Sequence, residues 1–429
     1  MSSDRTQQFI QAYRNLTLSP LLRDEEIADF WVSAYGEKVL TRLRQSVLLA
    51  GDNGRIWFSG QRGCGKSTLI GQLAKQLRQE GLYVVGFSMA DMVEMSDVSH
   101  ISILYAIALR LLESTQRQNV SLPSNISAKL TAWFAHTGEA FYDEQLSEGS
   151  VARTGMLDVI KRKLKGEHAF REQIAQKYAF RTDELVQQID LIAAAIQVAT
   201  NQPVVVMVDD LNKLYFKDFE AIFREHAKAL WGPNIRLVFV VPVATAKDFA
   251  AGTWSYFDSA QVTMGVVQLF ARAQVRAAEA VPIEENVALL AAVLQRRLPE
   301  TLIEPEILRE MVLMSGGVLR DLMRLAKECC QECLLRLEES QQQNIQIDLE
   351  ILQAAAHTLR LDMARALGSE LYDLLSTIHR ELRPPDARSE DFQMLLNGLY
   401  VLEYGEGEEI WYDVHPLVKN LLRQKALTD

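Results

Sequence analysis

The sequence of 429 residues has little cysteine, no long apolar runs and no excess of positive charge. Its four cysteines are too few for a disulfide framework, and they predict reduced thiols in a cytoplasmic protein. No stretch approaches the roughly 18 consecutive apolar residues of a membrane-spanning helix. The polar N-terminus lacks the apolar centre of a signal peptide. The formal net charge of −11 argues against a general affinity for nucleic acid, although a local basic patch could still bind it.

What the sequence does contain is a phosphate-binding loop. Residues 60–67 read Gly-Gln-Arg-Gly-Cys-Gly-Lys-Ser, which fits the motif G-x-x-x-x-G-K-[ST]. An apolar run at 55–59 predicts a strand before the loop, and leucines at helical spacing over 68–79 predict a helix after it. The glycines let successive backbone N–H groups face inward, as an anion nest at a helix N-terminus. This is the structural context that the motif requires.

The motif assigns a role to each part of the loop. We expect Lys66 to reach the β- and γ-phosphates of a nucleotide and the Ser67 hydroxyl to ligate Mg²⁺. Because Cys64 lies inside the loop, its oxidation or alkylation could block the nucleotide. The residues expected around the nucleotide are Gly60, Gln61, Arg62, Gly63, Cys64, Gly65, Lys66, Ser67 and Thr68.

A second part of the site is predicted at 203–210, which reads Pro-Val-Val-Val-Met-Val-Asp-Asp. So dense an apolar run is typical of a strand that is buried on both faces of a parallel sheet. We expect Asp209 to hold Mg²⁺, directly or through water, and Asp210 to polarise the attacking water. The alternative, a solvated turn after a core strand, loses weight because the loop at Gly60 lies in the same chain.

The chain divides into four predicted regions. Residues 1–54 show apolar residues at helical spacing, and 55–275 alternate strands with helices, which predicts a parallel sheet covered on both faces. Further strands are expected at 82–87, 235–241 and 261–269. A helical insertion, or an extended helical layer, occupies about 90–200, with helices at 101–112 and 185–199. Residues 276–360 read as a helical lid, in which Gly316 and Gly317 end one helix before the next begins near Val318.

The last region, 361–429, changes in character. Helices are predicted at 367–382 and about 392–399, then a hairpin of 400–404 and 410–414, and a final helix after Pro416. Helices followed by a two-stranded wing suggest a winged-helix fold. The predicted fold class is therefore α/β: a P-loop NTPase parallel sheet with a large helical insertion, a helical lid and a C-terminal winged-helix domain.

The order of these features resembles the AAA+ and STAND ATPases, especially the branch related to origin-recognition proteins. The resemblance rests on the loop at 60–67, the Asp-Asp pair, the Gly-Gly-x-x-Arg motif at 316–320 and the C-terminal hairpin. It implies ATP as the nucleotide, and it implies that Arg320 is the lid arginine, sensor 2, that reaches the γ-phosphate. The alternative for Arg320 is a surface helix that also carries Asp321 and Arg324. The resemblance places sensor 1 after the fourth strand, where Thr245 is the best candidate.

Members of these families often take an arginine finger from a neighbouring subunit, which would make the protein a homo-oligomer. Arg224, Arg272 and Arg276 are candidates, although none of them lies in a recognisable motif. Asp210 stands where many AAA+ proteins have Glu, and it is one methylene shorter. Slow hydrolysis, in a switch rather than a motor, fits that departure.

Two features bear on partners. The wing carries Glu403, Glu406, Glu408 and Glu409, which would repel phosphate, so a protein-docking or self-regulating role is favoured over DNA binding. Its aromatic residues either anchor a protein partner or pack the core of the small domain; they are Tyr404, Trp411 and Tyr412.

A basic segment in the insertion favours DNA binding instead. It consists of Lys161, Arg162, Lys163, Lys165 and Arg171, followed by Lys177 and Arg181 and interleaved with Phe170, Tyr178 and Phe180. Cations mixed with aromatic residues can follow a nucleic-acid backbone and stack on its bases. A solvated helix face is the alternative.

Three classes of function remain open. The favoured one is an ATP-binding and hydrolysing switch that couples nucleotide state to the assembly of a protein complex, for example in signalling or anti-phage defence. The second is a DNA-associated ATPase, such as a replication initiator, a loader or a transposition regulator. The third is a scaffold that binds nucleotide with little hydrolysis. DNA binding that is lost on neutralising residues 161–165 would favour the second class, and negligible turnover would favour the third.

Overall fold

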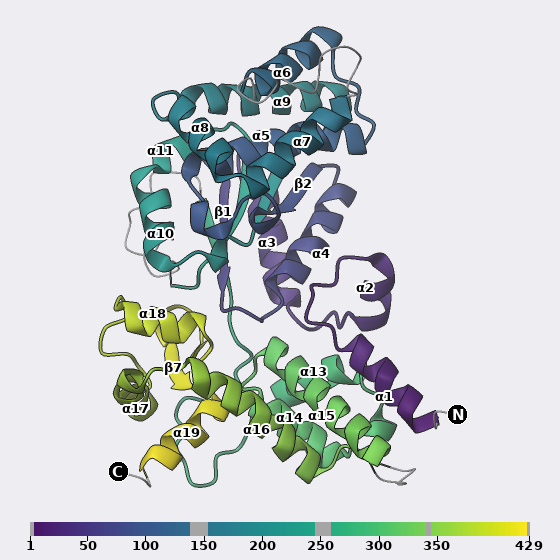
Figure 1. Ribbon diagram of the computed structural model, residues 1–429, viewed down its shortest axis with the longest axis vertical. Coiled ribbons are helices and arrows are strands. Elements are labelled where there is room, and N and C mark those ends of the chain that lie inside the picture. The colour runs from purple at the N-terminus through teal and green to yellow at the C-terminus, as the bar shows by residue number, and fades with distance from the viewer. Residues whose placement is uncertain (1–3, 138–152, 245–258, 340–344, 427–429) are drawn as a thin grey trace. The chain divides into compact units, whose positions relative to one another are not determined.

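The computed structural model describes residues 4–137, 153–244, 259–339 and 345–426 (Figure 1). The chain forms two compact units. The sheet unit comprises residues 38–59 and 70–262. The helical unit comprises residues 1–37, 60–69 and 263–429. The phosphate-loop segment 60–69 thus groups with the N-terminal and C-terminal parts of the chain.

The sheet unit is built on a five-stranded sheet in the order β2-β3-β4-β1-β5. The strands are β1 Arg55–Gly60, β2 Tyr83–Ser88, β3 Val204–Asp209, β4 Arg236–Val241 and β5 Ser259–Met264. The pairs β2–β3, β3–β4 and β4–β1 are parallel. All five strands were expected from their apolar runs, and β5 begins and ends earlier than the expected 261–269. Parallel pairing brings the carboxyl ends of β1, β3 and β4 to one edge of the sheet.

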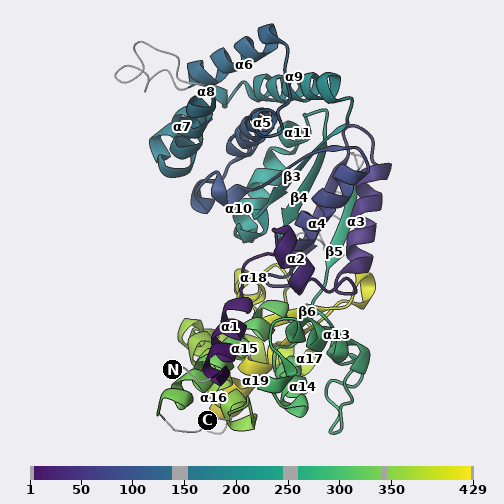
Figure 2. The same ribbon diagram turned by 90° about the vertical axis from the view of Figure 1, so that its right-hand side faces the viewer.

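Helices cover both faces of this sheet, which explains why its strands read as unbroken apolar runs. Helix α3, Glu37–Leu49, and helix α4, Lys66–Gln79, lie on one side (Figure 2). Helices α5, His100–Arg117, and α10, Phe216–Glu220, lie on the other. On that second face Trp57 packs against the rings of Phe223, Trp231 and Phe239.

The long stretch between β2 and β3 is helical, as expected. Its helices are α5, α6 Ser124–Thr137, α7 Arg153–Gly166, α8 His168–Tyr178 and α9 Thr182–Thr200. Buried residues of α5–α9 share one hydrophobic core with the strands, so the stretch is an extended helical layer on the sheet. Between β3 and β4 lie α10, a π-helical turn at Ala221–Glu225 and α11, Ala227–Leu230.

A buried arginine fastens the amino end of the sheet. Arg55 is fully buried, and its guanidinium donates to the carbonyls of Asn53, Gly54, Trp231, Pro233 and Ile235. Burial lowers the pKa of Arg55 to about 10, which still leaves it charged at neutral pH. It ties β1 to the loop that leads into β4.

The helical unit begins with α1 Asp4–Asn15 and α2 Asp24–Phe30, and continues with the lid helices α13 Glu284–Gln295, α14 Pro305–Met314, α15 Leu319–Glu339 and α16 Leu349–Ala366. Helix α1 packs against α15, and Arg5 donates to the carbonyls of Thr301 and Ile345. Gly316 and Gly317, both at positive φ, separate α14 from α15 as predicted.

The C-terminal region contains α17 Tyr372–Glu381, α18 Glu390–Asn397, β6 Val401–Tyr404, β7 Trp411–Val414 and α19 Pro416–Ala426. β6 and β7 form an antiparallel hairpin in the register Val401↔Val414. The predicted order of two helices, hairpin and final helix is present. The first helix starts five residues later than expected, after a short 3₁₀ turn at Ser369–Leu371.

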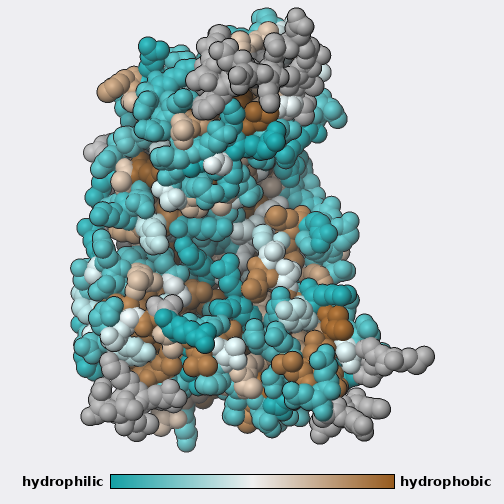
Figure 3. Space-filling view, viewed as in Figure 1, coloured by the Kyte–Doolittle hydropathy of each residue, from teal (hydrophilic) through white to brown (hydrophobic). Residues whose placement is uncertain are grey.

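Within the described ranges, the helices are too short or too polar to cross a bilayer. On the face shown in Figure 3, hydrophilic residues surround small apolar groups.

Candidate nucleotide site

The phosphate loop joins the end of β1 to the start of α4, and its backbone is shaped by three glycines. Gly60, Gly63 and Gly65 have φ values of +150°, +82° and +89°, which residues with a side chain rarely adopt. Helix α4 begins at Lys66, so the N–H groups of its first turn face the loop. The local structure is therefore the glycine-rich turn between a strand and a helix that the sequence predicted.

Lys66 closes this loop from within. Its ammonium donates to the carbonyl of Gly60 at 2.7 Å and to that of Gln61 at 2.8 Å, and the residue is only 5% exposed. The lysine thus lies across the loop and braces its first two residues. Ser67, the next residue of α4, is half-buried.

The lid touches the loop through its backbone. The Arg320 N–H donates to the Gly63 carbonyl at 3.0 Å, and a Cβ placed on Gly63 would lie 2.7 Å from the Arg320 Cβ. Arg320 itself is exposed, and Asp321 beside it is buried. The Gly-Gly-x-x-Arg motif therefore lies against the loop, and the contact of the Arg320 side chain with a γ-phosphate stays a prediction.

The N-terminal segment also contacts the loop, and the sequence did not predict these contacts. The Tyr35 hydroxyl donates to the Cys64 carbonyl at 2.9 Å, and the Leu21 N–H donates to Thr68 Oγ1 at 3.1 Å. Burial raises the pKa of the Cys64 thiol to about 11. A buried thiol with a raised pKa reacts slowly, and whether its oxidation or alkylation would block the nucleotide stays a prediction. No local signal in the sequence marks Tyr35 or Leu21 as partners of the loop.

The two predicted acids lie at the carboxyl end of β3, in the sheet unit. Asp209 is the last residue of the strand and stands in register with Ser88 at the end of β2. Asp210 follows in a left-handed conformation, with φ of +72°. The Ser88 hydroxyl and the Lys213 ammonium, the latter at 2.8 Å, both contact the Asp210 carboxylate. Ser88 and Lys213 were not singled out in the sequence.

The parallel register places these acids at the edge where β1 ends. Ser59, directly before the loop, pairs with Val241 at the end of β4, and β4 also pairs with β3. Asp209 and Ser59 therefore both lie at the carboxyl edge of the sheet, which is where ligands bind in open α/β sheets.

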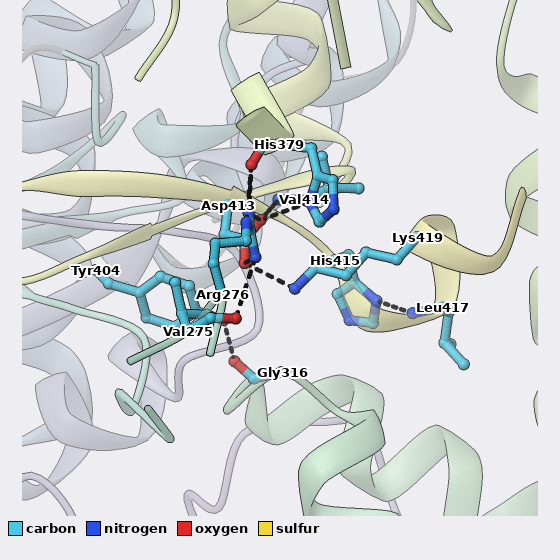
Figure 4. Close-up of polar contacts among 10 residues, drawn as sticks. All are labelled: Val275, Arg276, Gly316, His379, Tyr404, Asp413, Val414, His415, Leu417 and Lys419. Atoms are coloured by element: carbon cyan, nitrogen blue, oxygen red, sulfur yellow. Dashed lines mark hydrogen bonds and ion pairs between the residues drawn. The ribbon is translucent and has the colours of Figure 1, made fainter. Parts of the chain in front are cut away.

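Of the three arginine-finger candidates, Arg276 is engaged by its own chain. It donates to both carboxylate oxygens of the buried Asp413, at 2.5 and 3.0 Å, and to the His379 carbonyl (Figure 4). Arg224 pairs with Glu220 at 2.8 Å, and Arg272 is exposed. Thr245, the candidate for sensor 1, lies outside the described residues.

The basic segment is less free than its sequence suggested. Arg171 is buried and donates to Asp97 at 2.7 Å, while Lys165 donates to the Ala90 carbonyl at 2.6 Å and pairs with Glu94 at 3.1 Å. These two cations belong to the fold, because the carbonyls and carboxylates that they contact would otherwise lose their partners. Arg162 is exposed, and Lys161 and Lys163 are half-buried.

The aromatic residues around that segment do not form a stacking surface. Phe170 and Tyr178 are fully buried, and Phe180 is exposed. The interpretation of cations interleaved with exposed aromatic rings is therefore wrong for two of its three aromatic residues. Their spacing on α8 is core spacing.

The aromatic residues of the C-terminal hairpin are core residues too. Tyr404 and Trp411 stack at 4.6 Å, and both are buried. The Tyr412 hydroxyl donates to Glu403 at 2.6 Å, so Glu403 is a buried acceptor and not part of an exposed acidic tip. Of the two alternatives for these rings, packing in the core of the small domain is the one that the structure shows.

The strand order, the loop after β1 and the acids after β3 make this an α/β fold of the P-loop NTPase type. Among solved structures, a RuvB variant from Thermotoga maritima has 14% identity and a TM-score of 0.37, with 95% of this chain and 98% of that chain covered. Cdc6p from Pyrobaculum aerophilum has 12% identity and a TM-score of 0.36, with 96% and 98% covered. The Orc1 protein of Aeropyrum pernix, determined in complex with DNA, has 10% identity and a TM-score of 0.39, with 94% and 96% covered.

No protein-family model matches the chain, and no curated protein matches its sequence.

Proposed function

We propose that the protein is an ATP-binding and slowly hydrolysing switch of the AAA+/STAND type, which couples its nucleotide state to the assembly of a protein complex. The observation that carries this proposal is the phosphate loop itself. Three glycines at positive φ lead into the N-terminus of a 14-residue helix, and a buried lysine braces the turn. Helix N-terminal amides and a desolvated ammonium are the groups that bind a polyphosphate.

The residues present fit Mg²⁺·ATP. Loop amides from Gly60 to Thr68 and the Lys66 ammonium would hold the phosphates, and Ser67 with Asp209 would hold the metal ion. A hydroxyl and a carboxylate are the hard oxygen ligands that Mg²⁺ prefers. When bound, the ion would neutralise charge on the phosphates.

Asp210 is the proposed base that orients the attacking water. Its carboxylate already accepts from Ser88 and pairs with Lys213. These contacts engage one site on each carboxylate oxygen and hold the side chain in place, and Asp is one methylene shorter than the Glu of many AAA+ proteins. This supports slow turnover, and with it a switch rather than a motor.

The lid and the C-terminal region are the parts that we propose to change position with the nucleotide state. Arg320 would report the γ-phosphate, because its own backbone N–H already touches the loop at Gly63. The C-terminal region, which we propose to be a winged helix, would change its docking with the nucleotide state and so expose or cover a protein-binding surface. We also propose that the protein forms a homo-oligomer in the cytoplasm. In that oligomer, a neighbouring subunit would supply the arginine finger.

The first test is ATP binding. Lys66→Ala should weaken ATP affinity about 30-fold or more, since the lost ammonium contacts are worth about 2 kcal/mol or more. Lys75→Ala, which removes an exposed lysine from the same helix, is the matched control and should leave affinity unchanged. Isothermal titration calorimetry measures both. If ATP affinity is unchanged in Lys66→Ala, the assignment of the ATP site to this loop is wrong.

The second test is ATP turnover across a series of protein concentrations, with and without double-stranded DNA. Turnover that rises with protein concentration and ignores DNA supports a self-assembling switch. Stimulation by DNA would replace the proposal with a DNA-associated ATPase, and Arg162→Ala would then be the next variant. ATP binding without turnover at any concentration would indicate a scaffold.

A further inference from the structure

The side chain of Gln61 joins the phosphate loop to the C-terminal hairpin. Gln61 is the second residue of the loop, and it is only 2% exposed. Its Nε2 donates to the Val401 carbonyl at 2.8 Å and to the Leu396 carbonyl at 3.2 Å. Its Oε1 accepts from the Glu403 N–H at 2.7 Å. All hydrogen-bonding groups of the amide except one lone pair are thus directed at the C-terminal region.

The amide imitates a neighbouring strand. In a parallel ladder, one residue donates to a carbonyl and accepts from the N–H two residues further along the partner strand. Gln61 does the same to Val401 and Glu403 with its side chain alone. It therefore fills the open edge of β6, whose other edge pairs with β7. If the side chain were removed, a buried carbonyl and a buried N–H of the hairpin would lose their partners.

The backbone of the same residue holds the catalytic lysine. The Gln61 carbonyl accepts from the Lys66 ammonium at 2.8 Å. Residue 61 is thus fixed on one side by the C-terminal hairpin and on the other by the group that is to meet the phosphates. A displacement of the hairpin would pull on the residue that positions Lys66.

From these contacts, we infer that Gln61 couples the docking of the C-terminal hairpin to nucleotide binding. Docking on Gln61 preorganises the loop for phosphate, and bound nucleotide strengthens docking by the same factor, because coupling between two equilibria is reciprocal. The inference rests on the proposed function, since it takes ATP to be the ligand of the loop. It adds the residue through which the C-terminal region senses that ligand.

A second anchor of the C-terminal region allows docking to be weakened without touching the loop. Arg276 and Lys419 hold the buried Asp413 of β7, and the Tyr404 hydroxyl of β6 donates to the Gly316 carbonyl of the lid at 2.7 Å (Figure 4). Arg276 also donates to the His379 carbonyl at the end of α17. Arg276→Gln should therefore loosen the hairpin. Arg296→Gln, which changes an exposed arginine elsewhere in the helical unit, is its matched control.

The experiment is a double-mutant cycle on the full chain, with ATP affinity from calorimetry and amide hydrogen exchange of the hairpin as readouts. Gln61→Met keeps the length of the side chain and removes its hydrogen bonds. Without nucleotide, this variant should speed exchange of the Glu403 amide at least tenfold. It should also weaken ATP affinity about three- to tenfold. In the wild type, ATP should slow exchange of that amide by a similar factor.

Arg276→Gln completes the cycle. It should weaken ATP affinity in the wild-type background and have little further effect in the Gln61→Met background. Arg296→Gln should leave ATP affinity unchanged in both backgrounds. Additive effects of Gln61→Met and Arg276→Gln would overturn the coupling, as would ATP affinity that is unchanged or tighter in Gln61→Met.

Failure of the proposed function looks different. If the wild type binds no ATP, the proposed function is wrong, and there is no nucleotide binding to which docking of the hairpin could be coupled. The acceleration of Glu403 exchange in nucleotide-free Gln61→Met would still report whether the side chain holds the hairpin. A wild type that binds ATP without any change in Glu403 exchange overturns the inference alone.

Discussion

Two glycines with the same backbone conformation allow the contact between lid and loop to be measured. Gly63 and Gly81 both have φ of +82°. An alanine at either position has to adopt that left-handed conformation, which costs about 1 kcal/mol. At Gly81 a new Cβ meets nothing within 4 Å. At Gly63 it would lie 2.7 Å from the Arg320 Cβ and 3.1 Å from a Val318 methyl group. Overpacking of this kind typically costs a further 1–3 kcal/mol, roughly.

We therefore expect Gly81→Ala to lower the free energy of unfolding by about 1 kcal/mol, and Gly63→Ala to lower it by about 2–4 kcal/mol. Calorimetric unfolding of both variants under one set of conditions measures the difference. Gly63→Ala should also weaken ATP binding about tenfold or more, since the loop and the lid have to separate. Adding Arg320→Ala should not relieve the strain, because the atom in conflict is the Cβ. Equal losses for the two glycine variants would refute the packing of the lid on the loop.

Three further predictions concern single groups. Asp210→Asn should bind ATP normally and lose turnover, and persistent phosphate release would mean that another group is the base. Burial alone would raise the pKa of Asp413, but hydrogen bonds from His379, Arg276 and Lys419 hold it well below its ordinary range. Its contribution is therefore present above about pH 4 and lost as pH falls further. Asp413→Asn should thus destabilise the chain by about 2–4 kcal/mol at pH 7, with the gap to the wild type closing in acid during chemical denaturation. Burial raises the pKa of Cys64 to about 11. Iodoacetamide at pH 8 should therefore leave Cys64 unmodified, as detected by mass spectrometry, and ATP binding should stay intact. Rapid labelling would show that the loop is open.

The elements that the sequence predicted well are those whose signal is local. The strands that end at Asp209 and Gly60 are dense apolar runs, and the loop glycines allow few other conformations. Gly316 and Gly317 likewise end α14 by their backbone freedom. For these elements a short window of sequence contains most of the physical information.

The side-chain partners could not be predicted in the same way. Gln61 reads as an arbitrary residue of the motif, and its partners lie more than 330 positions later. Arg171 reads as one more surface cation, although its partner Asp97 is 74 residues away. A run of cations and aromatic residues in the sequence does not show which side chains lie on the buried face of a helix and which on the exposed face.

The aromatic residues of the hairpin show a related limit. Alternation in a four-residue strand predicts one exposed face, yet all of Val401–Tyr404 and Trp411–Val414 are buried. A short hairpin enclosed by helices has no free face, and only the tertiary structure shows that enclosure.

The packing of α1 against α15 has a consequence for synthesis of the protein. The partner of α1 appears about 300 residues after it, and ribosomes add about 5–20 residues per second, so α1 leaves the ribosome roughly 15–60 s before α15. During that interval Phe9, Ala12 and Leu16, which are buried in the finished protein, have no native partner. The same delay applies to those contacts of the phosphate loop that come from residues 263–429, such as Arg320 to Gly63. A chain that stops before α15 would therefore leave the apolar face of α1 uncovered and the phosphate loop without its contact to Arg320.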